Sequence, residues 1–148
     1  MSGTLSSEST FLDGNVRKWS LPELELPLPP DTPTVKRLLL PQGELAQFYD
    51  GNEGIHYLAF IELRGGNARG NHYHKVKEEW VYLIAGKVAL LVEDVQTKER
   101  TSVPMQKGDL ALIRTGIAHA LQVLEAGQAV EFSPARFDHL DIHKYPLG

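Results

Sequence analysis

Two histidines and a glutamate lie close together in the segment GNARGNHYHKVKEEWVYLIAG, residues 66–86, which has a glycine at each end. His72 and His74 are separated by one residue, so on a strand their side chains point to the same face. Glu79 follows after a short turn, and His119 supplies a fourth group later in the chain. Neutral imidazoles and a carboxylate bind divalent ions such as Zn, Ni, Mn or Fe. The spacing therefore predicts one divalent metal ion, held by three His and one Glu.

The composition limits the class of protein. A chain of 148 residues suits one domain, and its formal charge of -4 gives no electrostatic reason to expect nucleic acid or an anionic membrane as a partner. Because the chain has no cysteine, any metal must be held by nitrogen and oxygen. The N-terminus lacks a signal-peptide pattern, and no segment is long and apolar enough to span a bilayer. We expect a soluble, cytoplasmic protein with a small-molecule ligand.

The first 34 residues are predicted to form an N-terminal arm, either flexible or packed on the barrel proposed below or on a partner subunit. Residues 1–20 are rich in Ser, Thr and Gly, which suits a flexible segment rather than a core element. Residues 21–34 carry most of the prolines, and proline at this density disfavours helix and central strand. We therefore expect residues 21–34 to be extended.

Residues 35–148 are predicted to form a single all-β domain with a short C-terminal tail. Short apolar runs are separated by turn signals such as DGNEG, RGGN, AG and EAGQ. Regular spacing of this kind, without helical periodicity, favours an antiparallel sandwich or barrel.

Side-chain parity identifies the inner face of these strands. A two-residue hairpin turn at Gly86–Lys87 would place Glu79 on the same face as Val88 and every second residue after it. Glu78 then points the other way, so Glu79 is the predicted ligand. The predicted inner residues are Glu79, Val81, Leu83, Ala85, Val88, Leu90 and Val92, joined on a later strand by His119, Leu121 and Val123.

The opposite face is too apolar to lie open to water. It carries Trp80, Tyr82, Ile84, Ala89 and Leu91. The N-terminal arm, a second sheet or a second subunit would each cover it, and a homodimer built on this face is our preferred interpretation.

The residues that make up the predicted site resemble the cupin superfamily. Its first motif, G(X)5HXH(X)3,4E(X)6G, is matched by Gly66, His72, His74, Glu79 and Gly86. Its second motif, G(X)5PXG(X)2H(X)3N, is matched by Gly108, Gly116 and His119, with Arg114 in place of proline and Val123 in place of asparagine. The resemblance covers residues 35–132 and implies a jelly-roll β-barrel in which His72, His74, Glu79 and His119 are the metal ligands.

Within that superfamily, the runs RGNHYHK and GDLALIRTGIAHAL are similar to RmlC-like and polysaccharide-biosynthesis cupins. That group includes a metal-binding branch. It also includes nucleotide-sugar isomerases and epimerases in which histidines act as acid and base without a metal.

Four further residues are candidates for the pocket around the ligands. His56 and Tyr57 lie on the strand before the first motif, and alternation lets only one of them face inward. Arg69 precedes the ligand strand and would suit an anionic substrate, and Leu121 shares the face of His119. His139 and His143 are four residues apart in the tail, where we expect surface residues.

Three functions are compatible with this sequence. The first is a metal-dependent cupin enzyme, either an isomerase or epimerase or a dioxygenase, that acts on a small oxygenated molecule such as a sugar or keto acid. The second is a metal-free nucleotide-sugar isomerase or epimerase that uses histidine acid-base chemistry. The third is a non-catalytic protein that binds a small ligand.

Overall fold

The computed structural model describes residues 7–66 and 68–147, and its regular structure is almost entirely β-strand. The strands are β1 (Ser7–Phe11), β2 (Val16–Ser20), β3 (Glu23–Glu25), β4 (Lys36–Leu40), β5 (Gly43–Gln47), β6 (Tyr57–Leu63), β7 (Ala68–Tyr73), β8 (Glu79–Asp94), β9 (Arg100–Gln106), β10 (Asp109–Ile113), β11 (Ile117–Ser133) and β12 (His143–Lys144). A short 3-10 helix, η2 (His139–Asp141), precedes β12. None of the helical structure in these residues is long enough to span a membrane.

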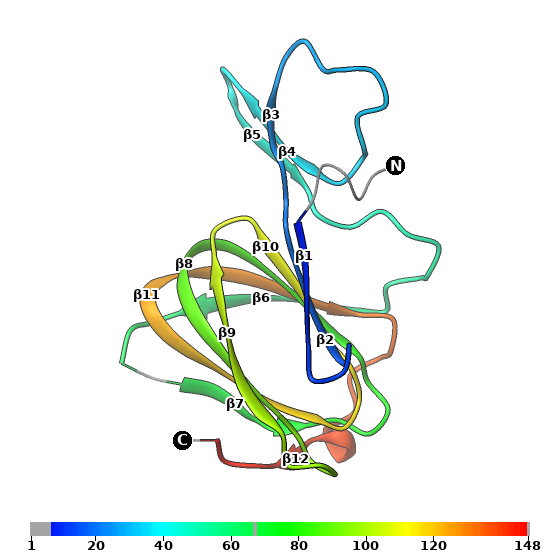
Figure 1. Cartoon of the computed structure of the whole chain (residues 1–148), viewed down its shortest axis with the longest axis vertical. Coiled ribbons are helices and arrows are strands. Elements are labelled where there is room, and N and C mark those ends of the chain that lie inside the picture. The colour runs from blue at the N-terminus through cyan, green and yellow to red at the C-terminus, as the bar shows by residue number, and fades with distance from the viewer. Residues whose placement is uncertain (1–6, 67, 148) are drawn as a thin grey trace.

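The two long strands β8 and β11 organise a barrel (Figure 1). They pair with each other along most of their lengths. The first part of β8 also pairs with β10 and its second part with β9, whereas the first part of β11 pairs with β7 and its second part with β6. Each long strand therefore passes from one wall of the barrel to the other. This confirms the predicted all-β jelly roll.

The predicted hairpin turn at Gly86–Lys87 is wrong, because β8 continues without a break from Glu79 to Asp94. Gly86 has a φ of 96°, and a Cβ on it would lie only 2.6 Å from the carbonyl oxygen of Glu125. The register between β8 and β11 shifts at this point. A β-bulge reverses the alternation of side chains along a strand, as a two-residue turn would. The residues predicted to face inward on both sides of Gly86 are therefore buried or nearly so, although no turn is present.

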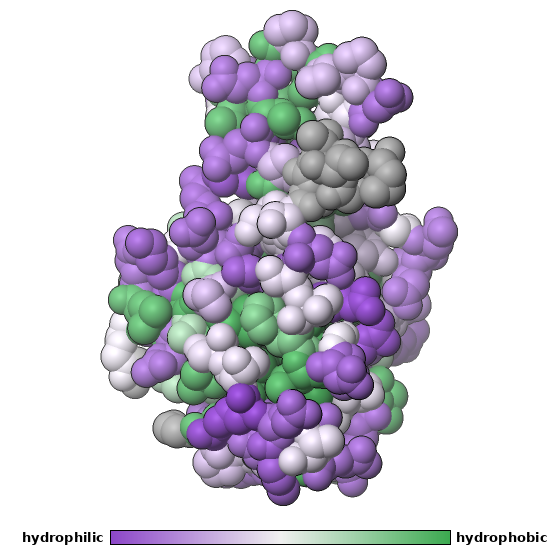
Figure 2. Space-filling view, in the orientation of Figure 1, coloured by the Kyte–Doolittle hydropathy of each residue, from purple (hydrophilic) through white to green (hydrophobic). Residues whose placement is uncertain are grey.

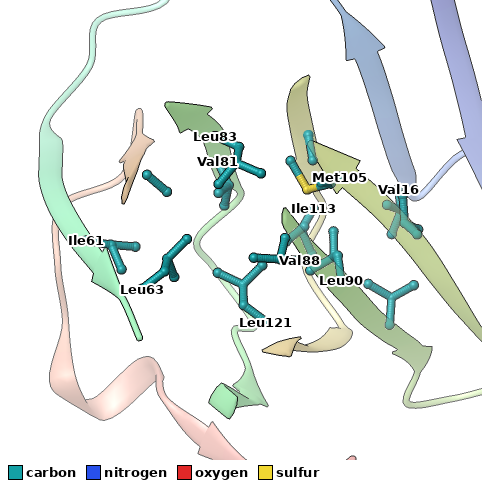
Figure 3. Packing of buried hydrophobic residues seen from close by; sticks show 14 of the residues in the cluster. Val16, Ile61, Leu63, Val81, Leu83, Val88, Leu90, Met105, Ile113 and Leu121 are labelled. Carbon is teal, nitrogen blue, oxygen red and sulfur yellow. The ribbon is translucent and has the colours of Figure 1, made fainter. Parts of the chain in front are cut away.

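The space between the two barrel walls is filled by an aliphatic core, part of which is shown in Figure 3. Val81 and Leu83 from the first part of β8 meet Val88 and Leu90 from its second part, because the strand curves around the core. Leu121 lies at the edge of this core. The aliphatic packing fixes the backbone on which the polar residues of the site are mounted.

Segments of the same chain cover the outer apolar face. Trp19 stacks on Trp80 at a ring-centroid distance of 5.6 Å, and Phe48 stacks on Tyr82 at 4.3 Å. Near the C-terminus, Leu147 packs in the cluster that contains Leu91. The homodimer stays a prediction, and this face alone no longer requires it.

The region expected to be an arm contains regular structure. β1 and β2 form a hairpin, and β2 pairs with β10 in the barrel sheet, with Val16 fully buried. These residues extend the sheet rather than forming the flexible segment that their composition suggested. β3 pairs with β4 in a small three-stranded sheet with β5, which projects away from the barrel (Figures 1 and 2). Residues 1–6 of the predicted arm lie outside the described residues.

Candidate active site

Three histidines line one wall of the barrel interior, and we call His72, His74 and His119 the histidine wall. His72 on β7 lies directly opposite His119 on β11. The two strands approach closely at Gly70, where a Cβ would lie 2.8 Å from the carbonyl oxygen of His119. One ring nitrogen from each histidine lies within 4.8 Å of the others. The sequence prediction that these histidines converge agrees with this arrangement.

Backbone carbonyls orient two of the three imidazoles. The Nδ1 atom of His74 lies 2.8 Å from the carbonyl oxygen of Asp141, and the Nδ1 atom of His119 lies 3.0 Å from that of Ile117. A carbonyl only accepts hydrogen bonds, so Nδ1 carries the proton in each ring. The Nε2 atoms of His74 and His119 are buried and have no hydrogen-bond partner among the described residues. Both face the same interior space.

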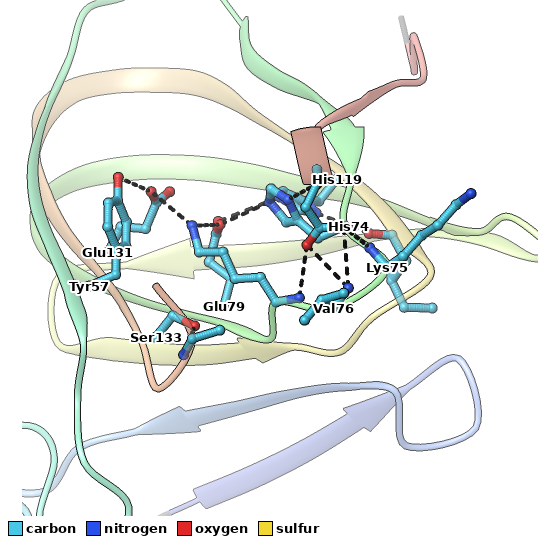
Figure 4. Close-up of polar contacts among 12 residues, drawn as sticks. Tyr57, His74, Lys75, Val76, Glu79, His119, Glu131 and Ser133 are labelled. Atoms are coloured by element: carbon cyan, nitrogen blue, oxygen red, sulfur yellow. Dashed lines mark hydrogen bonds and ion pairs between the residues drawn. The ribbon is translucent and has the colours of Figure 1, made fainter. Parts of the chain in front are cut away.

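The facing wall carries carboxylates, a lysine and a tyrosine, and we call Tyr57, Lys77, Glu79 and Glu131 the carboxylate wall (Figure 4). The carboxylate of Glu79 lies 3.4 Å from His74 Nε2 and 3.5 Å from His119 Nε2, so it links the two walls. Lys77 Nζ lies 3.4 Å from Glu79 and 4.0 Å from Glu131. The Tyr57 hydroxyl donates to Glu131 at 3.3 Å. A continuous set of polar contacts therefore crosses the barrel.

Burial and neighbouring charges move the pKa values of these groups in different directions. Burial, followed by repulsion from His119 and His74, lowers the pKa of His72 to about 4. Burial would raise the pKa of Glu79, but the neighbouring His119, His74 and Lys77 hold it well below its usual range. Burial and the nearby Glu79 raise the pKa of Glu131 to about 7. Burial and Glu131 also raise the pKa of Tyr57, which keeps its phenol protonated.

A cavity of about 110 Å³ lies between the two walls. Of the residues predicted from the sequence, seven line it: His72, His74, Glu79, His119, Tyr57, Arg69 and Leu121. His56 does not, because its ring is exposed and its Nδ1 lies 2.8 Å from the carbonyl oxygen of Pro134. The structure thus brings the three histidines together, places Glu79 beside His74 and His119, and adds three of the four pocket candidates.

Sequence reasoning missed three residues of the site. Lys77 precedes Glu79 by two positions, so parity could have placed it on the inner face. Glu131 lies between the apolar residues Val130 and Phe132, so nothing in the local pattern marks it as an inward-facing residue. Asp141 is far from the motifs in sequence, and no local signal marks it.

Asp141 fastens the C-terminal segment to the site. Its buried carboxylate accepts hydrogen bonds from the backbone N–H groups of Lys75, Val76 and Lys77 at 2.8 to 3.3 Å. Its own carbonyl oxygen accepts from His74. One residue therefore orients a histidine of one wall and fixes the loop that carries the lysine of the other.

The remaining motif residues lie outside the cavity. Glu78 forms an ion pair with Arg114 at 3.6 Å, with both side chains partly exposed. His139 belongs to η2 and is exposed, whereas His143 belongs to β12 and lies 3.7 Å from Asp141. The two tail histidines are therefore in separate elements.

The donor set fits a divalent metal ion. Three ring nitrogens lie close together, and the Nδ1 contacts of His74 and His119 leave both Nε2 atoms free to bind. Histidine ligands in metal sites commonly use the N–H of their other ring nitrogen to donate a hydrogen bond to a carbonyl or carboxylate in this way. Glu79 would add an oxygen ligand, although Lys77 already offsets its charge.

The fold is a cupin-type jelly roll of the RmlC-like kind. The chain belongs to the family described as the polysaccharide biosynthesis C-terminal domain, which matches residues 42–132. No curated protein sequence matches the chain.

Several solved structures share this fold. The dTDP-4-dehydrorhamnose 3,5-epimerase from Sulfolobus tokodaii is 13% identical with a TM-score of 0.71, over 92% of this chain and 78% of that one. The WlaRB TDP-quinovose 3,4-ketoisomerase from Campylobacter jejuni is 12% identical with a TM-score of 0.65, over 75% and 88%. The capsular polysaccharide assembling protein CapF from Staphylococcus aureus is 19% identical with a TM-score of 0.58, over 62% of this chain and 27% of that one.

Proposed function

We propose that this protein is an epimerase or isomerase that acts on the sugar of a nucleotide sugar by transferring protons in the barrel cavity. The observation that carries the proposal is that two titratable groups with separated pKa values line one cavity. They are His72, whose pKa is lowered to about 4, and Glu131, whose pKa is raised to about 7. Pairs of titratable groups whose environments separate their pKa values are typical of acid-base catalysis. The polysaccharide biosynthesis family and the sugar-modifying enzymes of the same fold support this choice of substrate.

The two walls would perform complementary steps on a keto sugar. The neutral imidazole of His72 removes a proton from the carbon next to the carbonyl group, and the bonding electrons move to the carbonyl oxygen as an enolate. The Tyr57 phenol, hydrogen-bonded to Glu131, donates a proton on the other side of the cavity. Return of a proton to the opposite face of the carbon gives the epimer. Protonation of the former carbonyl carbon gives the isomer, when the hydroxyl proton on the deprotonated carbon moves to the enolate oxygen and leaves a new carbonyl there.

Lys77 supplies the positive charge that an enolate needs. It is buried, lines the cavity, and lies 4.1 Å from the centroid of the Tyr57 ring. A fixed cation in a dry cavity stabilises negative charge that develops during proton removal. Lys77 is thus suited to hold the carbonyl end of a substrate, while His72 and Tyr57 face the carbon from opposite sides.

Solvent exchange tests this proposal directly. The protein is incubated in D2O with a dTDP-keto sugar, and NMR follows deuterium incorporation next to the carbonyl and the appearance of epimer or isomer. We expect incorporation that requires His72. Tight binding of the nucleotide sugar without exchange or product, across a panel of keto and reduced sugars, would instead indicate a non-catalytic binding protein.

A metal-dependent version of the same reaction is the second candidate, and a different observation favours it. The Nε2 atoms of His74 and His119 are buried and have no hydrogen-bond partner in the described part of the chain, and they lie beside His72 and Glu79. These four residues would hold the ion. When bound, a divalent metal polarises a substrate carbonyl as a Lewis acid.

Elemental analysis distinguishes the two versions. Protein purified without chelator is compared with a His74→Ala variant, and exchange in D2O is repeated after chelator treatment and after addition of Zn, Ni, Mn or Fe(II). The metal-dependent version predicts stoichiometric metal that is lost in the variant, and activity that chelator removes. Unchanged exchange after complete metal removal would establish the metal-free version.

A further inference from the structure

A second cavity adjoins the catalytic one at the C-terminal segment of the chain. Its volume is about 390 Å³, and it shares Gly70, His72 and Ile142 with the catalytic cavity. Its other lining residues are Asn71, Lys144 and Pro146. Small-molecule sites usually measure about 300–1,000 Å³, so the catalytic cavity of about 110 Å³ is too small for a whole nucleotide sugar. The adjoining space is needed for the rest of the molecule.

Lys144 lies where it would contact the part of a ligand that extends out of the catalytic cavity. In the antiparallel pair of β7 and β12, Lys144 lies directly opposite His72. Residues opposite each other in such a pair carry their side chains on one face, with Cβ atoms about 5 Å apart. Lys144 is exposed and forms no ion pair within the part of the chain that the structure describes, and it is the one charged residue among those that line the second cavity.

The backbone around Lys144 is held in place by β7. The N–H of Tyr145 donates to the carbonyl oxygen of Asn71 at 2.8 Å, and the N–H of Leu147 donates to the Asn71 side chain at 2.9 Å. Asp141 anchors the segment on its other side. The position of the lysine is therefore part of the fold. In Figure 2 the end of the molecule where β12 lies in Figure 1 presents mainly hydrophilic residues.

We propose that the second cavity binds the diphosphate of the nucleotide sugar, with Lys144 as its cationic ligand. This inference rests on the proposed function, because it assumes that the sugar occupies the catalytic cavity beside His72. In a nucleotide sugar, the group joined directly to the sugar ring is the diphosphate, which is anionic. An ammonium group opposite His72 places positive charge where that group leaves the first cavity.

Binding of fragments to wild type and to three variants, measured by isothermal titration calorimetry, tests the site without requiring turnover. The fragments are dTDP, inorganic pyrophosphate and thymidine. The variants are Lys144→Gln, Lys144→Arg and Lys87→Gln, the last being an exposed lysine outside both cavities. We expect Lys144→Gln to weaken dTDP and pyrophosphate about tenfold and to leave thymidine unchanged. Lys144→Arg should restore most of the affinity, and Lys87→Gln should bind as wild type does.

The outcomes separate this inference from the proposed function. Equal dTDP affinity in wild type and Lys144→Gln, or no dTDP binding to wild type, overturns the diphosphate site whatever the enzyme does. If dTDP binding depends on Lys144 but no keto sugar exchanges its proton, the site stands and the proposed reaction fails. If exchange occurs and Lys144→Gln leaves its KM unchanged, the reaction stands and the site fails.

Discussion

The histidine wall and the carboxylate wall face each other across one cavity, but they are encoded in different ways. His72 and His74 come from a single tripeptide on β7, and His119 lies opposite His72 on the paired strand β11. The carboxylate wall instead joins β6, the loop before β8, the start of β8 and the far end of β11. Local spacing defines two of the three histidines and one strand pair adds the third, whereas the second wall is assembled from four separate segments.

This difference bears on what each wall does. Two of the histidines are oriented by backbone carbonyls, and the third, His72, is kept uncharged by its lowered pKa. The carboxylate wall is a chain of interacting charges in which Lys77 lies between Glu79 and Glu131. One wall therefore suits ligand binding or proton abstraction, and the other suits control of charge. Substitutions in each wall should have different signatures.

The largest effect should come from the histidine wall. Replacing His72 with asparagine removes the proposed base but keeps a polar side chain, and we expect deuterium exchange into a dTDP-keto sugar to fall about 10³-fold. His56→Asn is the matched control, because His56 lies outside the cavity. Exchange by His72→Asn within threefold of wild type would exclude His72 as the base.

The sequence predicted the histidine wall because its evidence is local. A HisXHis pair on a strand fixes its own geometry, and parity selected Glu79 over Glu78. The same reasoning misread Gly86, where a bulge in a continuous strand gives the parity of a turn. Both long strands of the jelly roll were divided into two for this reason, at AG and at EAGQ.

The carboxylate wall was harder to predict because its residues become neighbours only through tertiary pairing. Glu131 points into the barrel, whereas the neighbouring Phe132 packs outside it in the aromatic cluster. At this point the polar residue faces inward and the large apolar residue faces outward. Asp141 lies in the tail after the region matched by the family and still reaches the site. Composition also failed to predict β1 and β2, because a Ser-rich and Thr-rich hairpin at the edge of a sheet needs few apolar residues.

The second prediction concerns the residue that connects the two walls. Asp141→Ala leaves the N–H groups of Lys75, Val76 and Lys77 without their acceptor, and we expect a loss of about 3 kcal/mol in the free energy of unfolding. Asp138→Ala, which removes the cap of η2 at an exposed position, should cost less than about 1 kcal/mol. Urea denaturation measures both. Equal losses would show that Asp141 does no more than an ordinary cap.

The Asp141 effect should also depend on pH. Burial alone would raise the pKa of Asp141, but its three backbone hydrogen bonds lower it below 3.8. A carboxyl group with a lowered folded-state pKa stabilises the fold above its unfolded pKa, and that stability is lost as the pH falls through the folded value. The difference between wild type and Asp141→Ala should therefore shrink below pH 3.8.

The third prediction compares two carboxyl groups of the same wall. The pKa of Glu131 is raised to about 7, so its contribution to stability is complete below pH 4.5 and is lost as the pH rises to about 7. The pKa of Glu79 is lowered, so its contribution is present above pH 4.5 and is lost as the pH falls below that value. Denaturation of Glu131→Gln and Glu79→Gln across this range should give differences from wild type with opposite slopes. Slopes of the same sign would mean that the fold does not shift the pKa values of the two carboxyl groups in opposite directions.

The smallest effect should come from Arg114, which lies outside both walls and occupies a position where cupins usually have proline. Its side chain pairs with Glu78 at the surface, so Arg114→Gln should cost less than about 0.5 kcal/mol and leave deuterium exchange unchanged. Its backbone N–H, however, donates to the carbonyl oxygen of Asn15 in the β1–β2 turn at 3.0 Å. Proline cannot make this bond, so Arg114→Pro should cost about 1 kcal/mol, measured by urea denaturation. If the proline variant is as stable as the glutamine variant, attachment of the N-terminal hairpin does not account for the departure from the cupin motif.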